Sequence, residues 1–168
     1  MDTTNTNTPR TLVLALIFLF ASGCTLAQTD LPTGRVIGVK DGDTVVLLIN
    51  KREVTVRLQG VDCPEKRQAF GERAKQFTSD FCFGKTISLD STGVDRYGRV
   101  LGAIILEDGR NLNVELVRAG MAWWYKRYSK DETLERLENE ARAQRIGLWS
   151  DPNPIAPWDF RRGTRTGS

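Results

Sequence analysis

Two strand-forming runs separated by a short polar stretch place the strongest constraint on how this chain can fold. Thr44–Ile49 is a run of β-branched and apolar residues, and from Val54 to Leu58 apolar side chains alternate with polar ones. The polar residues Asn50–Glu53 between them indicate a turn. The pattern predicts an antiparallel hairpin, in which the start of the first strand lies beside the end of the second.

The remaining elements are predicted from periodicity and from their terminating residues. Apolar side chains recur at helical spacing from Phe70 to Phe81, and Gly84 ends that helix. Two more helices are expected, a short one from Asn113 to Ala119 and one that starts at a capping box formed by Ser129 and Glu132 and ends at Gly147. Further strands are expected at Arg35–Val39, Thr86–Leu89 and Arg99–Leu106.

Three strands, a helix, two strands and then further helix is the order of a five-stranded barrel of the OB type. We therefore predict an α+β fold, a five-stranded OB-type β-barrel with about three α-helices. This fold commonly binds nucleic acids or sugars, which is a hint about function at the level of the fold alone.

Both ends of the chain differ in composition from the predicted barrel. The apolar run Leu12–Phe20 follows Arg10 and is too short to span a bilayer, so residues 1–27 are predicted to be a signal peptide. Small residues before Cys24 are typical of a lipoprotein signal, which would lipidate Cys24; cleavage near Ala27 by an ordinary signal peptidase is the alternative. We expect an exported protein, either a cell-envelope lipoprotein or a periplasmic or secreted one.

These boundaries assign residues 28–150 to the folded domain and residues 151–168 to a Pro-rich, basic tail, which we expect to be extended. Export would place Cys63 and Cys82 in an oxidising compartment. They are expected to form either a disulfide or two buried free thiols, and two cysteines alone do not decide between these.

The chain of 168 residues contains no histidine. This absence excludes Ser-His-Asp triads and zinc sites that need imidazole ligands. Catalysis must then use carboxylates, arginine, lysine, tyrosine, cysteine or a hard metal ion. The net charge of +3 is mild, and would indicate an anionic partner only if the positive charge is focused on one face.

The predicted hairpin brings four acidic residues to one rim of the barrel. Asp41 and Asp43 flank Gly42 before the first strand, and Asp62 and Glu65 follow the second. Carboxylates this close repel one another unless a cation, arginine or lysine lies between them. Oxygen ligands without histidine favour Ca²⁺ or Mg²⁺. The alternative is a set of solvated rim charges paired to surface lysine and arginine.

Two arginines favour the functional interpretation of this rim. Arg57 projects from the strand that ends at the acids, and Arg99 closes the compact motif DRYGR. Guanidinium groups make forked, permanently charged contacts with phosphate oxygens. Together with a divalent ion they would neutralise the charge that develops during cleavage of a phosphodiester, and a free carboxylate could orient or deprotonate water.

Three motifs in order, DGDT, RLQGVDCPE and DRYGR, resemble those of the staphylococcal-nuclease-like thermonucleases. The similarity runs from about Gly34 to Trp149, and the ending GLWSDPNPIAPWDFRR resembles the exported bacterial branch of that family. The resemblance implies a Ca²⁺-dependent, sugar-non-specific endonuclease that hydrolyses DNA and RNA and leaves 3′-phosphate ends.

The resemblance also implies roles for individual residues. Asp43 and Asp62 would be direct Ca²⁺ ligands together with the backbone carbonyl of Cys63, and Asp41 would lie just outside the direct ligands. Glu65 would be the general base or would position the attacking water. Threonine is usual in the family where Cys63 stands, and the segment after Glu65 is shorter than in the founding member.

The implied substrate contacts come from arginine and tyrosine side chains. Arg57 and Arg99 would bind the scissile phosphate and stabilise its transition state, and Arg96 and Tyr97 would contact a neighbouring phosphate. Aromatic rings that stack on bases would be supplied by Tyr125 and Tyr128. For Tyr125 and the tryptophans before it, packing in the core or at its rim is the alternative.

Two other functions use the same barrel. A catalytically silent OB-type module of the cell envelope would hold nucleic acid without cutting it. A structural or Ca²⁺-buffering envelope protein would need the rim acids but not two arginines directed at phosphate. In each case we expect a monomer without a protein partner.

Overall fold

The computed structural model describes Met1 and residues 31–165. The predicted signal peptide, lipidation at Cys24 and cleavage near Ala27 lie outside the described residues. No helix in the described part of the chain is long and apolar enough to cross a membrane.

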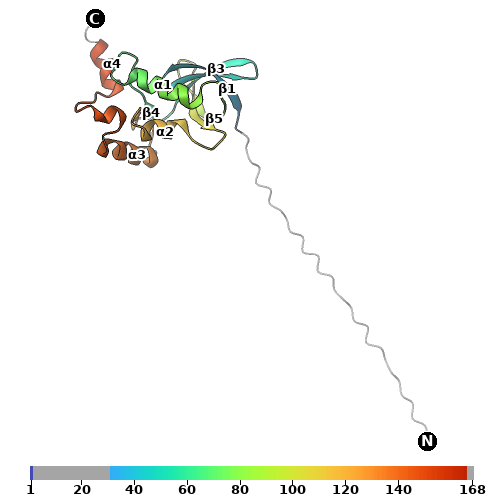
Figure 1. Ribbon diagram of the computed structural model, residues 1–168. Coiled ribbons are helices and arrows are strands. Elements are labelled where there is room, and N and C mark those ends of the chain that lie inside the picture. Colours follow the sequence, from blue (N-terminus) through green and yellow to red (C-terminus); the bar gives the residue numbers. More distant parts are fainter. Residues whose placement is uncertain (2–30, 166–168) are drawn as a thin grey trace.

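Five strands close into a barrel in the order β1-β2-β3-β6-β5 (Figure 1). Neighbouring strands are antiparallel except β3 and β6, which are parallel. The predicted α+β fold with an OB-type barrel is confirmed. The strands are β1 (Thr33–Asp41), β2 (Thr44–Ile49), β3 (Arg52–Leu58), β5 (Thr86–Val94) and β6 (Val100–Leu106).

The β2–β3 hairpin has the predicted pairing, with Thr44 at the start of β2 opposite Arg57 at the end of β3. Its turn is shorter than predicted, because β3 already begins at Arg52. The two residues between the strands, Asn50 and Lys51, both have positive φ, 48° and 64°. Positive φ at both central positions is the geometry of a type I′ turn, whose twist matches that of the paired strands.

The helices gather beside the barrel, and α4 lies far from the β2–β3 turn (Figure 1). Asp131 caps α3 by accepting a 2.8 Å hydrogen bond from the Thr133 N–H, so the prediction that Ser129 caps this helix is wrong. Ser129 instead accepts a bond from the Asp131 N–H. The helices are α1 (Gly71–Cys82), α2 (Leu112–Arg118), α3 (Glu132–Ala143), the 3₁₀ helix η1 (Gly147–Ser150) and α4 (Pro157–Arg165).

The C-terminal segment folds onto the domain. The prediction of an extended tail is wrong for residues 157–165, which form α4. The prolines of this segment suggested extension, but Pro157 stands at the first position of the helix, where its missing N–H has no cost. Trp158 then packs edge-on against Trp123, with ring centroids 5.6 Å apart, and seats the helix.

A second, two-stranded sheet joins β4 (Val61–Asp62) to β7 (Trp123–Trp124), with Asp62 opposite Trp123. Strands of two residues are too short to show a periodicity, and the sequence pattern did not predict them. The sheet fixes the backbone of Asp62 against the segment that follows α2.

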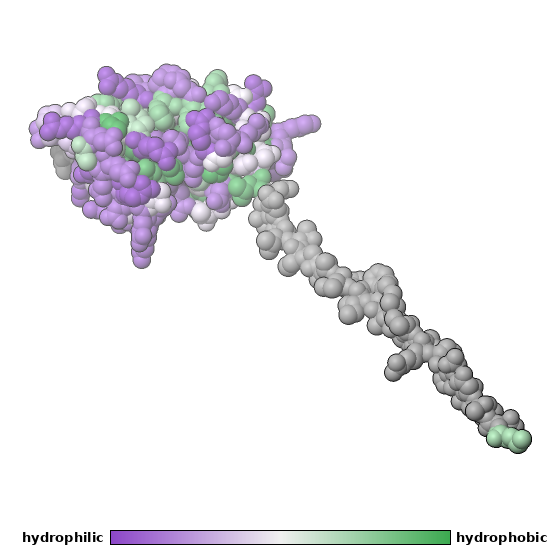
Figure 2. All heavy atoms as spheres, turned by 60° about the horizontal axis from the view of Figure 1, so that its bottom comes forward, coloured by the Kyte–Doolittle hydropathy of each residue, from purple (hydrophilic) through white to green (hydrophobic). Residues whose placement is uncertain are grey.

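The interior is aliphatic, and Cys63 and Cys82 lie within it as free thiols, so the structure decides between the two expected states of these cysteines. Burial raises the pKa of the Cys82 thiol to about 11. The face of the molecule shown in Figure 2 is mostly hydrophilic, with its apolar side chains in small separate groups.

Candidate active site

Asp43 and Cys63 join the turn before β2 to the residues after Gly60. The Cys63 N–H donates a 2.8 Å hydrogen bond to Asp43 Oδ2, and the Leu58 N–H donates one of 2.8 Å to the Asp43 carbonyl. Asp43 Oδ1 accepts a bond from the Thr44 hydroxyl. The turn before β2 therefore faces the residues after Gly60, as the hairpin pattern predicts.

The glycine between Asp41 and Asp43 is required by close packing. A Cβ at Gly42 would lie 2.8 Å from the Ala74 Cβ and 2.8 Å from the Cys63 Sγ. The Thr78 hydroxyl of α1 donates a 2.6 Å bond to the Gly42 carbonyl. Helix α1 thus packs directly against the turn that carries the two acids. A side chain at position 42 would push this turn away from α1 and from Cys63.

Arg57 lies between the two predicted metal ligands. Its Nη2 is 3.1 Å from Asp43 Oδ2 and 2.8 Å from Asp62 Oδ1. Its Nη1 donates to the backbone carbonyls of Leu58 and Val61, at 2.6 and 2.9 Å. Burial alone would lower the pKa of this guanidinium, but the Asp43 and Asp62 charges outweigh burial and raise it. Arg57 is therefore a fixed positive charge that holds the two carboxylates together.

The carboxylates remain costly to charge even with Arg57 present. Burial and the nearby Asp43 charge raise the pKa of Asp41 to about 6. Burial also raises the pKa of Asp62, although Arg161 and Arg57 both favour its charged form. Charging these buried carboxylates is therefore unfavourable unless a positive charge lies close to them.

The donor set fits a hard divalent cation in its chemistry. Asp43 and Asp62 supply oxygens, the Cys63 carbonyl is adjacent, and the rim contains no histidine. Across the described residues, no group of three acidic or sulfur side chains is already arranged around an ion position. The Asp43 and Asp62 oxygens point instead at guanidinium groups. A cation at these residues would have to replace some of these contacts.

Glu65 stands on the loop between β4 and α1. Its N–H donates a 3.1 Å bond to the Gln68 side chain, whose amide donates to the Ile155 carbonyl. A Cβ at Gly71 would lie 2.0 Å from the Glu65 carbonyl oxygen, so the first residue of α1 must be glycine for this loop to close. The Glu65 carboxylate is directed at Arg161.

Arg161 is the site residue that sequence reasoning missed. From α4 its Nη2 contacts Asp62 Oδ2 at 2.7 Å, and its Nη1 contacts Glu65 Oε1 at 2.6 Å and Asp62 Oδ1 at 3.3 Å. Its one signal in the sequence is the basic pair that ends the motif PWDFRR. The tail was expected to be extended, which left that pair unassigned.

Arg99 forms a second cluster on the β5–β6 turn with Arg96 and Tyr97. The Arg99 guanidinium pairs with Asp95 through Nε at 2.8 Å and Nη2 at 2.7 Å, rather than with the rim acids. The Arg96 and Arg99 guanidinium carbons lie 4.8 and 5.5 Å from the Tyr97 ring centroid. Arg99 directly precedes β6, which pairs in parallel with the β3 strand that carries Arg57.

The two tyrosines predicted to stack on bases differ in how far their rings are exposed. Tyr125 is stacked on Trp158 of α4, with centroids 5.2 Å apart and planes at 6°. It also meets Tyr128 edge-on at 4.8 Å. Tyr128 is 60% exposed, so it offers a ring surface to a base, whereas Trp158 covers one face of Tyr125.

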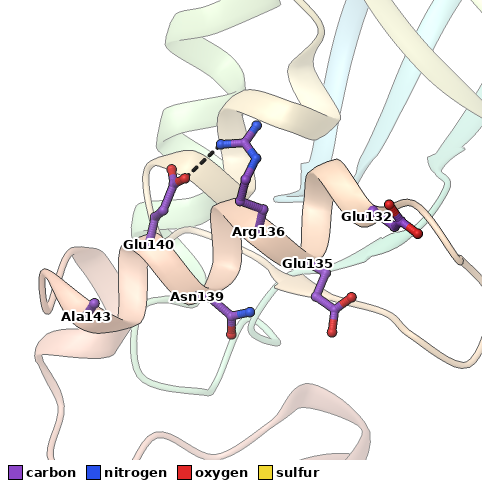
Figure 3. Close-up of a pocket in the computed structure, with 6 residues that line it drawn as sticks. All are labelled: Glu132, Glu135, Arg136, Asn139, Glu140 and Ala143. Atoms are coloured by element: carbon purple, nitrogen blue, oxygen red, sulfur yellow. Dashed lines mark hydrogen bonds and ion pairs between the residues drawn. The ribbon is translucent and has the colours of Figure 1, made fainter.

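An open hollow lies along α3, apart from the rim acids (Figure 3). Its lining side chains all come from this one helix, so no opposing wall encloses a ligand. Three of them are acidic, and Arg136 is paired with one of these, Glu140, at 2.7 Å. This negative face would repel phosphates, so the hollow along α3 is not a surface that suits an anionic substrate.

Comparison with known proteins shows the family to which the chain belongs. The family described as "Staphylococcal nuclease homologue" matches residues 55–151. The chain belongs to the staphylococcal nuclease family. The match includes Arg57, the residues after Gly60 and the DRYGR motif, and it confirms the predicted family and enzyme class, a nuclease hydrolase with nucleic-acid substrates. Nucleases of this family are generally metal-dependent.

Individual relatives cover most of the chain. It is 42% identical over 142 residues to "Micrococcal nuclease" of Shigella flexneri, covering 79% of this chain and 82% of the relative. It is 44% identical over 128 residues to "Uncharacterized endonuclease" of Escherichia coli, covering 76% and 84%. "Staphylococcal-like nuclease CAN1" of Arabidopsis thaliana is 35% identical over 117 residues, which is 70% of this chain and 36% of that protein.

Proposed function

We propose that this nuclease is a Ca²⁺-dependent endonuclease that hydrolyses both DNA and RNA and leaves 3′-phosphate ends. The observation that carries the proposal is the convergence of Asp43, Asp62 and Glu65 around the guanidinium groups of Arg57 and Arg161 at one rim of the barrel. Relatives named as nucleases and endonucleases support the reaction class. The choice of Ca²⁺, the range of substrates and the product ends rest on the sequence motifs.

The proposed metal ligands are Asp43, Asp62 and the Cys63 carbonyl. A bound divalent ion would neutralise charge on the phosphoryl oxygens and make water more acidic. Asp41 would support the site from just outside, through its hydrogen bond from the Asp43 N–H at 3.3 Å. Ca²⁺ suits this set because it accepts flexible, oxygen-only coordination.

Glu65 is the proposed general base or positioner of the attacking water. Its loop is held by Gln68 and by the contact with Gly71, which limits the positions that the carboxylate can take. Because a carboxylate is a weak base, its effect depends on this positioning as much as on its pKa.

Arg57 and Arg99 are the proposed phosphate ligands. Arg57 already directs both terminal nitrogens at protein acceptors, so contact with a phosphate would replace one of these bonds or use another edge of the guanidinium. Arg99, at 33% side-chain exposure and paired only within its own turn, can turn to a substrate more readily. Arg96 and Tyr97, beside Arg99 on the same turn, and the exposed Tyr128 are the further proposed substrate contacts.

The proposal is tested by incubating circular DNA and a single-stranded RNA with the purified protein in Ca²⁺, in Mg²⁺ and in a calcium chelator. The expected result is cleavage of both substrates in Ca²⁺ and none in chelator. The products should carry a 5′-hydroxyl that a kinase labels directly, and a 3′ end that a polymerase extends only after phosphatase treatment. Retained binding without cleavage would favour a silent nucleic-acid-binding module instead.

Export is a separate proposal that rests on the apolar run Leu12–Phe20. Mass spectrometry of the protein purified from membranes would detect a diacylglyceryl group on Cys24 if the lipoprotein signal is used. A soluble mature chain that begins after Ala27 would assign cleavage to an ordinary signal peptidase.

A further inference from the structure

Helix α4 delivers a positive charge to the oxygens that a cation would need. Arg161 Nη2 lies 2.7 Å from Asp62 Oδ2, while its Nη1 lies 3.3 Å from Asp62 Oδ1 and 2.6 Å from Glu65 Oε1. This is a forked contact that joins the predicted metal ligand to the predicted base. Arg57 holds Asp62 Oδ1 from the other side, at 2.8 Å. Both oxygens of Asp62 therefore already have positively charged partners.

The balance of charge at the rim explains why Arg161 remains there. Its side chain is 35% exposed, but the Asp62 side chain that it contacts is only 1% exposed. A buried carboxylate needs a compensating charge. Without Arg161, Arg57 alone would have to compensate the four acids of the rim, Asp41, Asp43, Asp62 and Glu65.

Packing seats α4 firmly enough to hold the guanidinium in place. Trp158, one turn before Arg161, packs against Trp123 and stacks on Tyr125. Ala156 is buried at the start of the segment, and the adjacent Ile155 carbonyl accepts the Gln68 amide bond from the Glu65 loop. The C-terminal segment thus contacts the Glu65 loop at two points, through the Ile155 carbonyl and through the Arg161 side chain.

We propose that Arg161 competes with the divalent cation for Asp62 and Glu65, so that helix α4 sets the cation concentration at which the nuclease becomes active. The inference rests on the proposed metal-dependent function. A guanidinium and a divalent ion cannot both take the same carboxylate oxygens, so binding of the ion requires Arg161 to leave at least part of its contact. By linkage, each must weaken the other by the same factor.

The test measures this linkage from both sides, with Ca²⁺ as the probe. Calorimetric titration of the chelator-stripped protein compares the wild type with Arg161→Gln and with Arg162→Gln. Arg162 is a matched control, because it is the next residue of α4 and pairs with Asp159 of the same helix. Arg161→Gln should bind Ca²⁺ about tenfold more tightly than the wild type, and Arg162→Gln should bind it like the wild type.

Urea unfolding gives the second readout, which does not depend on activity. Arg161→Gln should lower the unfolding midpoint in chelator and leave it nearly unchanged in saturating Ca²⁺, because the ion then takes over the compensation of Asp62. Trp158→Ala removes the seat of α4 and keeps Arg161, and it should tighten Ca²⁺ binding in the same direction. This variant keeps the inference testable if Arg161→Gln does not fold.

Three outcomes overturn the inference. Equal Ca²⁺ affinity in the wild type and Arg161→Gln, together with Ca²⁺-dependent cleavage, would reject the competition and leave the proposed function intact. Weaker Ca²⁺ binding by Arg161→Gln would make Arg161 a supporting residue of the metal site. Absence of both Ca²⁺ binding and Ca²⁺-dependent cleavage in the wild type would overturn the proposed function along with the inference.

Discussion

The Cys63 N–H donates a 2.8 Å hydrogen bond to Asp43 Oδ2 across 20 residues of sequence. This one contact joins the turn that precedes β2 to the loop that follows β3. It holds the segment that carries Asp62 and the Cys63 carbonyl beside Asp43, whose other oxygen, Oδ1, accepts a hydrogen bond from the Thr44 hydroxyl. The geometry of the site depends on this bond whichever side chain stands at position 63, because the donor is a backbone group.

Replacement of Arg57 by alanine should destabilise the protein strongly. The substitution leaves the buried carboxylates of Asp43 and Asp62 without their shared partner, and breaking a buried ion pair in this way costs about 3–5 kcal/mol. Urea unfolding in chelator measures the loss. Arg110→Ala is the matched control, because Arg110 is half exposed and pairs with Asp108 of its own turn, and it should cost less than about 1 kcal/mol. Equal losses would contradict the central position of Arg57.

Arg99→Lys should lower turnover by about tenfold or more, because lysine cannot make the forked contact with phosphate. The control is Arg110→Lys, since Arg110 pairs with the aspartate of its own turn in the way that Arg99 pairs with Asp95. Initial rates of DNA cleavage in saturating Ca²⁺ compare the two. Unchanged turnover in Arg99→Lys would remove Arg99 from the catalytic residues and leave its Asp95 contact as a structural one.

Gly71→Ala should displace the loop that carries Glu65. The added Cβ would lie 2.0 Å from the Glu65 carbonyl oxygen, so the backbone must move, at a cost of about 1–3 kcal/mol. Turnover should fall together with stability. Gly163→Ala, in α4, is the control, since an added Cβ there meets no described atom within 4 Å. Normal turnover in Gly71→Ala would show that the position of the Glu65 loop is not critical.

Glu138→Gln should change how stability depends on pH. Burial raises the pKa of Glu138 above 4.5, although Arg142 and the Trp124 N–H favour its charged form. A raised pKa in the folded state means that the wild type loses stability as the pH rises from below 4.5 through the folded-state pKa. The glutamine variant keeps an acceptor for the Trp124 N–H and should lack this loss. Thermal unfolding at pH 4 and pH 7 measures it, and a variant less stable than the wild type at pH 7 would contradict the direction.

The barrel and the acid rim could be predicted from the sequence because both follow from local pattern. Period-two alternation assigns the strands, and an antiparallel hairpin fixes which ends meet, so Asp43 and the residues after Gly60 could be placed together without coordinates. The two-residue turn at Asn50 and Lys51 was predicted too long, because these residues resemble an ordinary polar loop until their positive φ is known.

The contact between Arg161 and Asp62 could not be predicted, because it joins residues 99 positions apart and depends on how α4 is seated. Its seat is made by Trp123 and Tyr125, which belong to a two-residue strand and a loop with no periodic signal. The prolines around α4 also favoured an extended tail. Tertiary packing therefore determines both the helical fold of the C-terminal segment and the contact of Arg161 with Asp62.

The measurement that tests the central claim most directly is cleavage of an end-labelled DNA oligonucleotide in Ca²⁺ by the wild type, Glu65→Gln and Glu132→Gln. Glu132 lies on the acidic face of α3 and serves as the matched control. We predict that the wild type and Glu132→Gln cut the DNA only when Ca²⁺ is present, and that Glu65→Gln is slower by about 10²–10⁴-fold while it still binds the DNA. Undiminished cleavage by Glu65→Gln, or equal cleavage in a chelator, would contradict a metal-dependent site built on the acid rim.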